Sequence, residues 1–173
     1  MHRTFVIADT HFGHANIIKY ENRPFENERD MREQLIKNWN NRVSKGDVVY
    51  ILGDFSFYNK FFTSEIIRRL NGSLRLVMGN HDRGHSVKWW LETGMDEVYR
   101  FPVLYKNEII LSHEPLGDDI GPFKNIYGHV HSDPQYEAIT NRSACVSLER
   151  WGYEPVEIEK VIKMMEVERW KGL

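Results

Sequence analysis

The sequence predicts an α/β fold in which buried parallel strands alternate with helices over the first half of the chain. Two observations predict it: short apolar runs separated by apolar stripes at helical spacing, and polar side chains directly after each run. The runs are residues 4–8, 48–52, 74–78, 109–111 and 126–127. Open α/β sheets collect functional groups beyond the carboxyl ends of their strands. We therefore expect the segments after these runs to converge on one site.

Two helices are predicted between the first three strands. The first begins after Asn27, a good N-cap residue, and has an apolar stripe at four-residue spacing. This stripe consists of Met31, Leu35, Trp39 and Val43. The second helix is marked by Phe62, Ile66, Ile67 and Leu70 and ends at Gly72. Residues 55–62 are rich in aromatic side chains, which either wall the site, where they could stack on a nucleobase, or pack against the sheet; we prefer packing.

The second half of the chain is predicted to change from crossover units to hairpins. A short helix is expected before Gly94, and residues 97–105 and 108–111 are expected to form strands joined by a two-residue turn. Residues 144–148 are the last predicted core strand. The closing helix has an apolar stripe of Ile158, Val161, Ile162, Met165 and Trp170. Because no repeat or linker interrupts the sequence, residues 1–173 are predicted to form a single domain.

Composition excludes several classes of protein. A formal net charge of −2 and a pI near 6.4 give no basic footprint for a long nucleic-acid duplex, so a small anionic substrate fits the chain better. The lone Cys145 excludes an intrachain disulfide, and residues 1–8 lack the features of a signal peptide. We therefore expect a reducing, cytoplasmic setting. No apolar run approaches the ~20 residues that a membrane span needs. The sequence does not fix the oligomeric state.

Seven polar residues after the predicted strands have side chains that bind divalent metals. They are Asp9, His11, Asp54, Asn80, His113, His129 and His131. Imidazole, carboxylate and carboxamide groups suit Mn, Fe, Zn or Ni, and the absence of a thiolate argues against a soft-metal site. Seven ligands exceed what one ion uses, whereas two ions about 3.5–4 Å apart with a bridging carboxylate would use them all. We expect two divalent ions as cofactors, Mn first and Fe, Zn or Ni as alternatives.

The ordered series D-x-H, GD, GNHD, H and GHVH resembles the calcineurin-like metallophosphoesterases. The likeness is greatest to small stand-alone bacterial and phage members, which open with D-T-H-x-x-H-x-N-I as residues 9–17 do. It extends over residues 9–131, with a further likeness around 147–156. The resemblance implies a two-sheet sandwich flanked by helices. It also implies that Asp9, His11 and His131 bind one metal, that Asn80, His113 and His129 bind the other, and that Asp54 bridges them.

The resemblance further implies an enzyme, a metal-dependent phosphoric ester hydrolase that acts on a phosphodiester or phosphomonoester. A hydroxide held by the two metals would attack phosphorus. His81 would lie beside the phosphate and protonate the leaving alkoxide as the catalytic acid. Asp82 either orients His81 or caps the following turn.

Departures from related enzymes narrow the substrate. Protein phosphatases that act on Ser and Thr carry GDxVDRG, whereas Gly53-Asp54 is followed here by Phe55-Ser56-Phe57, so a protein phosphatase fits less well. Purple acid phosphatases have a tyrosine ligand at the position of Phe57. Repair exonucleases of the superfamily carry a capping domain that this chain lacks. A small phosphate ester, nucleotides included, is therefore the preferred substrate.

Further residues near the motifs are weaker candidates. His14, Asn16 and Arg23 in the first loop would bind phosphate if they face the opening, and loop packing is the alternative. Arg83 and His85 would contact substrate or lie on the surface. Glu149 either reaches a metal-bound water or pairs with Arg150. Two other functions stay open: a nuclease acting on single strands or ends, and a non-catalytic binding scaffold with the same fold.

Overall fold

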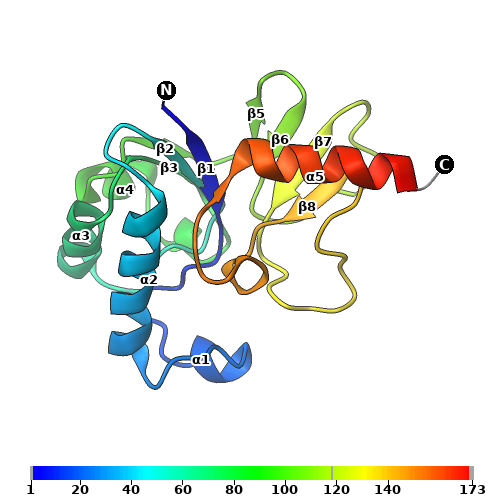
Figure 1. Ribbon diagram of the computed structural model, residues 1–173. Coiled ribbons are helices and arrows are strands. Elements are labelled where there is room, and N and C mark those ends of the chain that lie inside the picture. Colours follow the sequence, from blue (N-terminus) through cyan, green and yellow to red (C-terminus); the bar gives the residue numbers. More distant parts are fainter. Residues whose placement is uncertain (1, 118, 172–173) are drawn as a thin grey trace.

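A computed structural model describes residues 2–117 and 119–171, and within them the strands form two mixed sheets (Figure 1). The first sheet has the order β4 (Glu97–Tyr99), β3 (Ser73–Val77), β2 (Val48–Ile51), β1 (Thr4–Ile7) and β9 (Val156–Glu157). The second has the order β5 (Val103–Tyr105), β6 (Ile109–Leu111), β7 (Lys124–Tyr127) and β8 (Ser143–Cys145). Pairing is parallel except at β9 in the first sheet and β5 in the second.

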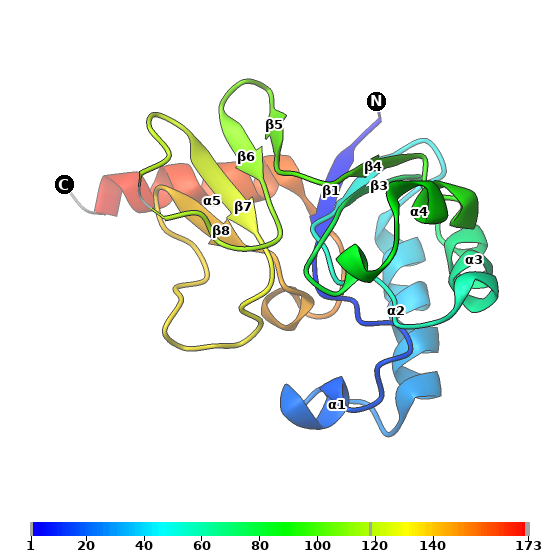
Figure 2. The ribbon, with the colours of Figure 1, turned by 180° about the vertical axis from the view of Figure 1, so that it is seen from behind.

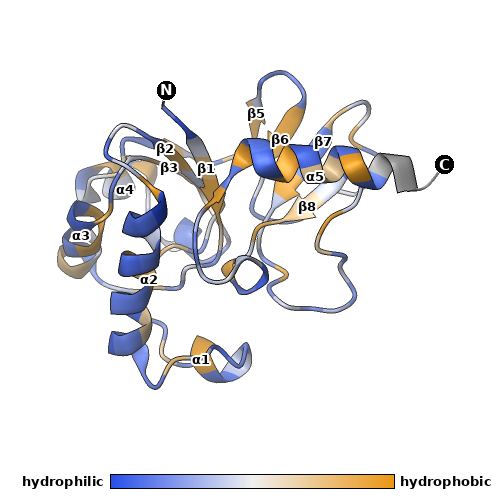
Figure 3. Cartoon of the chain, in the orientation of Figure 1, coloured by the Kyte–Doolittle hydropathy of each residue, from blue (hydrophilic) through white to orange (hydrophobic). Residues whose placement is uncertain are grey.

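Helices cover both sides of this pair of sheets. They are α1 (Ile17–Tyr20), α2 (Glu28–Arg42), α3 (Lys60–Arg69), α4 (Val87–Thr93) and α5 (Ile158–Lys171), with 3₁₀ turns at Asp82–Gly84 and Leu148–Trp151. Figures 1 and 2 show α2, α3 and α4 beside the first sheet and α5 across the second. Figure 3 shows hydrophobic strands and a largely hydrophilic α2, as expected for a helix that buries one stripe. No described helix is long and apolar enough to cross a membrane.

Alternating residues of the first sheet build two hydrophobic cores. In β1, Phe5 and Ile7 join the core shared with α2, α3 and α4, whereas Val6 packs in the core shared with the second sheet and α5. Successive side chains of a strand point to opposite faces, so an uninterrupted apolar run buries both faces. This arrangement confirms the predicted two-sheet sandwich flanked by helices.

The predicted helices are largely confirmed. The Asn27 side chain accepts a hydrogen bond from the Asp30 backbone N–H at 3.0 Å and so caps α2. Gly94 ends α4 with a φ of 110°. Helix α3 begins at Lys60 and ends at Arg69, before the predicted stop at Gly72. In α5, Ile158, Val161 and Met165 are buried as expected, whereas the Trp170 side chain lies outside the described residues.

Three predictions about the strands are wrong. Residues 97–105 do not form one strand but two, β4 and β5, which belong to different sheets. Pro102 lies between them, and proline cannot donate to a strand ladder. The second half also contains only one of the expected hairpins, because β6, β7 and β8 pair in parallel. Residues 146–148 leave the predicted last strand, and the 3₁₀ turn at Leu148–Trp151 follows.

The aromatic segment 55–62 is only partly packed, which corrects the expectation. Phe55 is fully buried, but Phe57, Phe61 and Phe62 are 41%, 65% and 51% exposed. Phe62 lies outside the buried face of α3, which carries Thr63, Ile66 and Ile67 instead. Because a helix buries only one face against a sheet, Phe62 on the other side of α3 remains exposed.

Candidate metal centre

The parallel strands of both sheets end at the same edge, where the predicted ligands meet. Ligand atoms of Asp9, His11 and His131 lie within 4.8 Å of one another, and so do those of Asp9, Asp54 and His113. The first sheet supplies Asp9, His11 and Asp54 from the ends of β1 and β2, and the second supplies His113 and His131 from the ends of β6 and β7. The predicted convergence of strand ends is therefore confirmed.

One cluster forms around the facing rings of His11 and His131. Their Nε2 atoms are 3.3 Å apart, and His11 Nε2 is 3.7 Å from Asp54 Oδ2. The Nδ1–H of His131 donates to Glu149 Oε1 at 3.0 Å, so in a neutral ring Nε2 carries a free lone pair. A lone pair aimed at other ligand atoms is the arrangement that a shared cation stabilises.

A second cluster surrounds Nε2 of His113. This atom lies 2.8 Å from Asn80 Oδ1, 3.1 Å from His129 Nδ1 and 3.5 Å from Asp54 Oδ1. His113 Nδ1–H donates to the Leu52 carbonyl at 2.9 Å, which again leaves Nε2 unprotonated in a neutral ring. The two oxygens of Asp54 thus face different clusters, Oδ2 toward His11 and Oδ1 toward His113. This is the position that a bridging carboxylate requires.

The burial of the donor groups also fits divalent cations. Asp9 Oδ1 is buried and has no hydrogen-bond partner among the described residues, although an orphaned buried oxygen is costly. Burial raises the pKa of Asp9 to about 7 and also raises the pKa of Asp54. Burial lowers the pKa of His11, His113 and His129, so these rings are neutral and able to donate lone pairs. A cation would offset the cost of charging the two carboxylates.

Backbone strain is concentrated in the ligand loops. Five of the seven predicted ligands have a positive φ: Asp9 (61°), His11 (51°), Asp54 (54°), His129 (72°) and His131 (45°). Left-handed conformations cost non-glycine residues on the order of 1 kcal/mol each and persist only where the surroundings impose them. The loops are therefore held in shapes that bring the side chains together.

Glycines in the motifs allow the loops to approach one another. A Cβ at Gly79 would lie 2.3 Å from Asp54 Oδ1, and one at Gly128 would lie 2.8 Å from Asp9 Oδ2 and 2.4 Å from Ala8 Cβ. These distances are shorter than any van der Waals contact, so a larger residue at either position would displace a carboxylate ligand. Close packing against the carboxylates therefore requires glycine at these positions of GNHD and GHVH.

Asp82 ties the loops after β2 and β3 to each other. Its carboxylate accepts hydrogen bonds from the backbone N–H groups of Asp54 (2.7 Å), Phe55 (3.1 Å) and Gly79 (2.8 Å). Burial raises the pKa of Asp82 to about 6. The structure thus corrects both expectations, because Asp82 holds the backbone of Asp54 in place instead of orienting His81 or simply capping a turn.

A buried ion pair between Arg23 and Glu149 holds the His131 ring through Glu149. Arg23 Nε and Nη2 donate to Glu149 Oε1 at 2.9 and 2.6 Å, and Nη2 and Nη1 donate to the carbonyls of Asp9 (2.7 Å) and Thr10 (3.1 Å). The Arg23 side chain is 0% exposed, which corrects the expectation that it faces the opening. Glu149 pairs with Arg23 and His131, not with Arg150. Sequence reasoning missed this pairing, because Arg23 and Glu149 are 126 residues apart.

The opening of the site is lined by His81 and an aromatic ring. The His81 side chain is 48% exposed, and its Nε2 lies 3.8 Å from Asp54 Oδ2. Phe57 stacks on His14 with ring centroids 4.4 Å apart and contacts His81 and His11 at 4.8 and 5.4 Å. For Phe57, three residues after Asp54, the alternative that the aromatic segment walls the site therefore applies, and not the preferred packing.

The remaining candidates lie outside the two donor clusters. His14 is half-buried beneath Phe57, and Asn16 is exposed at the start of α1 without a capping hydrogen bond. Arg83 is exposed and donates to both oxygens of Glu114 at 3.2 Å. His85 lies flat on a neighbouring ring, that of Trp89, with centroids 3.8 Å apart. These four residues are thus available near the surface, unlike Arg23.

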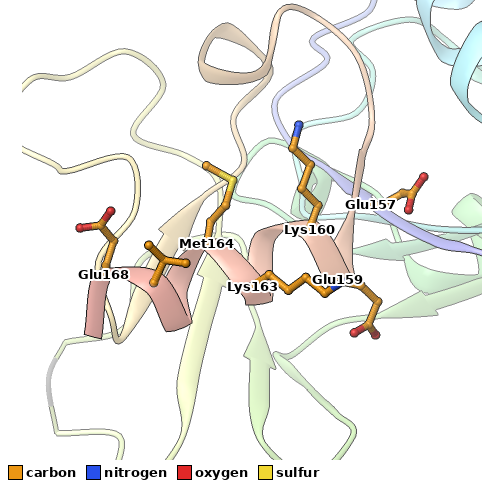
Figure 4. A pocket seen from close by; sticks show the side chains of 7 residues that line it. Glu157, Glu159, Lys160, Lys163, Met164 and Glu168 are labelled. Carbon is orange, nitrogen blue, oxygen red and sulfur yellow. The ribbon is translucent and has the colours of Figure 1, made fainter. Parts of the chain in front are cut away.

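A separate groove runs along α5, far in sequence from the ligands (Figure 4). It has a volume of about 500 Å³ and is lined by Lys160, Lys163, Met164 and Val167 among others. Figure 4 shows Lys160 and Met164 projecting from the helix beside each other. None of the predicted ligands lines this groove, so we do not place the functional site there.

The chain is similar to known proteins. The profile of the calcineurin-like phosphoesterase family matches residues 2–156, a range that contains all seven predicted ligands. The chain is 37% identical to an uncharacterized protein of Methanocaldococcus jannaschii, over 96% of this chain and 93% of that protein. It is 28% identical to the gene 66 protein of Mycobacterium phage L5, over 88% of this chain and 89% of that protein.

A solved structure is similar as well. The crystal structure of a protein of unknown function from Aquifex aeolicus superposes with a TM-score of 0.70 at 27% identity, covering 95% of this chain and 100% of that one. Together with the family profile, this likeness confirms the predicted resemblance.

Metal affinity is expected to rise with pH up to about 7. The pKa of Asp9 is about 7 without metal, so at lower pH its carboxyl holds a proton that a metal must displace. Each pH unit below this value then weakens binding by about tenfold if one proton leaves. Calorimetric titration of Mn²⁺ into the metal-free protein, in buffers of different ionisation enthalpy, measures both affinity and proton release. An affinity that stays constant between about pH 5.5 and pH 7 would contradict this expectation.

Removing the charge of Glu149 is expected to weaken metal binding. The carboxylate accepts the His131 Nδ1 hydrogen and fixes the ring, and loss of such a partner typically costs 10–100-fold in affinity, so we expect about that loss for Glu149→Gln. Glu154→Gln is the matched control, because Glu154 is a half-exposed glutamate paired only with Arg42 at 3.5 Å. Mn²⁺ titration of both variants gives the comparison, and urea unfolding checks that both remain folded. Equal affinities in the two variants would dismiss the role of Glu149.

Proposed function

The chain belongs to the calcineurin-like phosphoesterase family, and we propose that it is a metal-dependent phosphoric ester hydrolase with a two-metal centre. The observation that carries the proposal is the pair of donor clusters on the two sides of Asp54. One cluster is built around His11 and His131 and the other around His113. The complete ligand set supports an enzyme over a non-catalytic scaffold.

The proposed assignment gives each cluster one metal. Asp9, His11 and His131 would hold the first, Asn80, His113 and His129 would hold the second, and Asp54 would contact both. Mn is the first expectation, and Fe, Zn or Ni suit the same donors. When bound, the metals would supply Lewis-acid stabilisation of the phosphoryl oxygens and a water of lowered pKa.

His81 is the residue of this chain that would move a proton. Its backbone N–H donates to Asp54 Oδ1 at 3.1 Å, which fixes the start of its side chain beside the donor clusters. Its imidazole is half-exposed at the opening, where a phosphate ester would enter. An imidazole in this position can protonate the leaving oxygen.

The proposed substrate is a small phosphate ester, with nucleotides included. Phe57 supports this choice, because an exposed ring at the opening offers a flat apolar face to a nucleobase. His14 and Asn16 would add donors to the phosphate oxygens on the same side. An end-acting nuclease would use the same chemistry and differ only in the walls of the site. A cytoplasmic setting remains part of this proposal.

Hydrolysis of a generic aryl phosphodiester in the presence of Mn²⁺ tests the activity. We expect turnover by the wild type and loss of both metal and turnover in Asp54→Asn, because Asp54 lies between the two clusters. His81→Ala is expected to keep its metals and to lose about a hundredfold or more in kcat, the usual contribution of a general acid. Turnover is followed by release of the aryl alcohol, and metal content by elemental analysis. Absence of metal-dependent hydrolysis of any phosphoester would sink the proposal.

The role of Phe57 is tested by comparing two substrates that differ only in the nucleoside. Phe57→Ala is expected to lower kcat/KM for the p-nitrophenyl ester of thymidine 5′-phosphate by about tenfold, as removal of a base-stacking ring does. The methyl p-nitrophenyl ester has no base, so its kcat/KM should change little. Phe61→Ala, which truncates an exposed phenylalanine on α3, is the control. If the ratio of the two kcat/KM values in Phe57→Ala equals that of the wild type, the ring only packs against the histidines.

A further inference from the structure

A second pocket adjoins the GNHD segment at Met78 and Arg83 and is lined by basic residues. Its volume is about 450 Å³, and its walls include Met78, Arg83, His85, Ser86, Lys88 and Arg100. None of the described residues that line it is acidic. A concave surface with several cations and no carboxylate in its walls attracts anions.

The cations of this pocket are available to a ligand. Arg100 is exposed and forms no ion pair within the described part of the chain. Lys88 is 85% exposed, and its nearest carboxylate, that of Glu92, lies 3.8 Å away and also pairs with Lys60. Arg83 is paired with Glu114, but both side chains are half-exposed, and such pairs are weak in water. Arg83 is therefore able to share its guanidinium with a second anion.

Two connections join the pocket to the metal centre. Met78 and Arg83 flank the GNHD segment, and the Arg83 backbone N–H donates to the Gly79 carbonyl at 3.2 Å. The Arg83 side chain reaches Glu114, the residue after the predicted ligand His113. The pocket and the predicted site of hydrolysis thus share the loop after β3, and the Arg83–Glu114 ion pair connects a wall of the pocket to the loop after β6.

We propose that this basic pocket is a second anion subsite, which binds a phosphate group of the substrate next to the phosphate that is hydrolysed. The inference rests on the proposed function and narrows its substrate to phosphate esters that carry more than one phosphate. Arg83, Lys88 and Arg100 contact the additional phosphate. The shared chemistry is a phosphoryl group, whose source is either a short nucleotide chain or a nucleoside polyphosphate.

The test compares two substrates that differ by one phosphate. These are the p-nitrophenyl ester of thymidine 5′-phosphate, with and without a 3′-phosphate. We expect the 3′-phosphate to raise wild-type kcat/KM by about tenfold, an advantage that the double variant Lys88→Gln/Arg100→Gln loses. The control is Lys160→Gln/Lys163→Gln, which removes the same charge from the groove along α5 (Figure 4) and should keep the advantage. An equal advantage in the two double variants, or none in the wild type, would overturn the subsite.

A binding measurement keeps this test independent of turnover. Fluorescence anisotropy of a fluorescein-labelled thymidine tetranucleotide, in buffer containing a metal chelator, reports anion binding without catalysis. Lys88→Gln/Arg100→Gln should weaken binding by about tenfold and flatten its salt dependence, by roughly 0.7 in logarithmic slope per lost phosphate contact. The α5 variant should bind as the wild type does. If neither ester is hydrolysed, the proposed function fails, and the anisotropy alone then decides the subsite.

Two competitors identify the source of the phosphate. Displacement of the labelled tetranucleotide by unlabelled tetranucleotide alone identifies a nucleotide chain. Equal displacement by thymidine triphosphate identifies a nucleoside polyphosphate. Both results support the subsite, whereas binding that is the same in the wild type and in Lys88→Gln/Arg100→Gln contradicts it.

Discussion

The carboxylate of Asp9 joins the two sheets, and the rest of the site depends on this junction. Asp9 follows β1 in the first sheet, and its Oδ2 accepts hydrogen bonds from His129 N–H (2.9 Å) and Ser147 O–H (2.6 Å), which follow β7 and β8 in the second. The neighbouring backbone closes the same seam, because the Ala8 N–H donates to the Val146 carbonyl at 3.1 Å. Oδ1 is left buried without a hydrogen-bond partner among the described residues. One side chain therefore both joins the two sheets and leaves an oxygen free for a metal. The donor set thus depends on the same contact that holds the sheets together.

The register of the parallel strands positions the other ligands relative to Asp9. Ile7 pairs with Ile51 in the parallel ladder of β1 and β2, and two residues later the Asp9 N–H donates to the Gly53 carbonyl at 3.1 Å. Asp54 is thereby set beside Asp9, and the Asp82 carboxylate fixes its backbone from the β3 side. The ligand loops after β1, β2 and β7 are strained, and the carboxylates of Asp9 and Asp54 are buried, both of which cost free energy. The two hydrophobic cores on the faces of the first sheet offset this cost.

The sequence was sufficient to predict which side chains meet at the strand ends, but not the residues that support them. Asp9, Asp54 and His113 follow apolar runs, and a run that must be buried on both faces fixes where its polar end emerges. Glu149 carries no such signal, since its partner Arg23 is 126 residues away and only the closed sandwich brings them together. The division of residues 97–105 between two sheets was equally invisible, because β-branched and aromatic residues favour a strand without saying which sheet it joins. Exposure of Phe57 depended on the same tertiary arrangement.

The donor clusters and the residues proposed to contact the rest of the substrate lie on different parts of the fold. The donor clusters stand on strand ends that both cores hold in place, whereas Phe57 lies in the loop after β2, and Lys88 and Arg100 flank α4 and β4 at the surface. A substitution at a ligand position disturbs the seam between the sheets, but a substitution in these outer segments leaves the seam untouched. Substitutions in these outer segments are therefore expected to alter substrate preference without disturbing the donor clusters. The exposed Phe57 ring and the basic pocket suit the proposed ester, which has a flat base and a second phosphate, and neither feature belongs to the donor clusters.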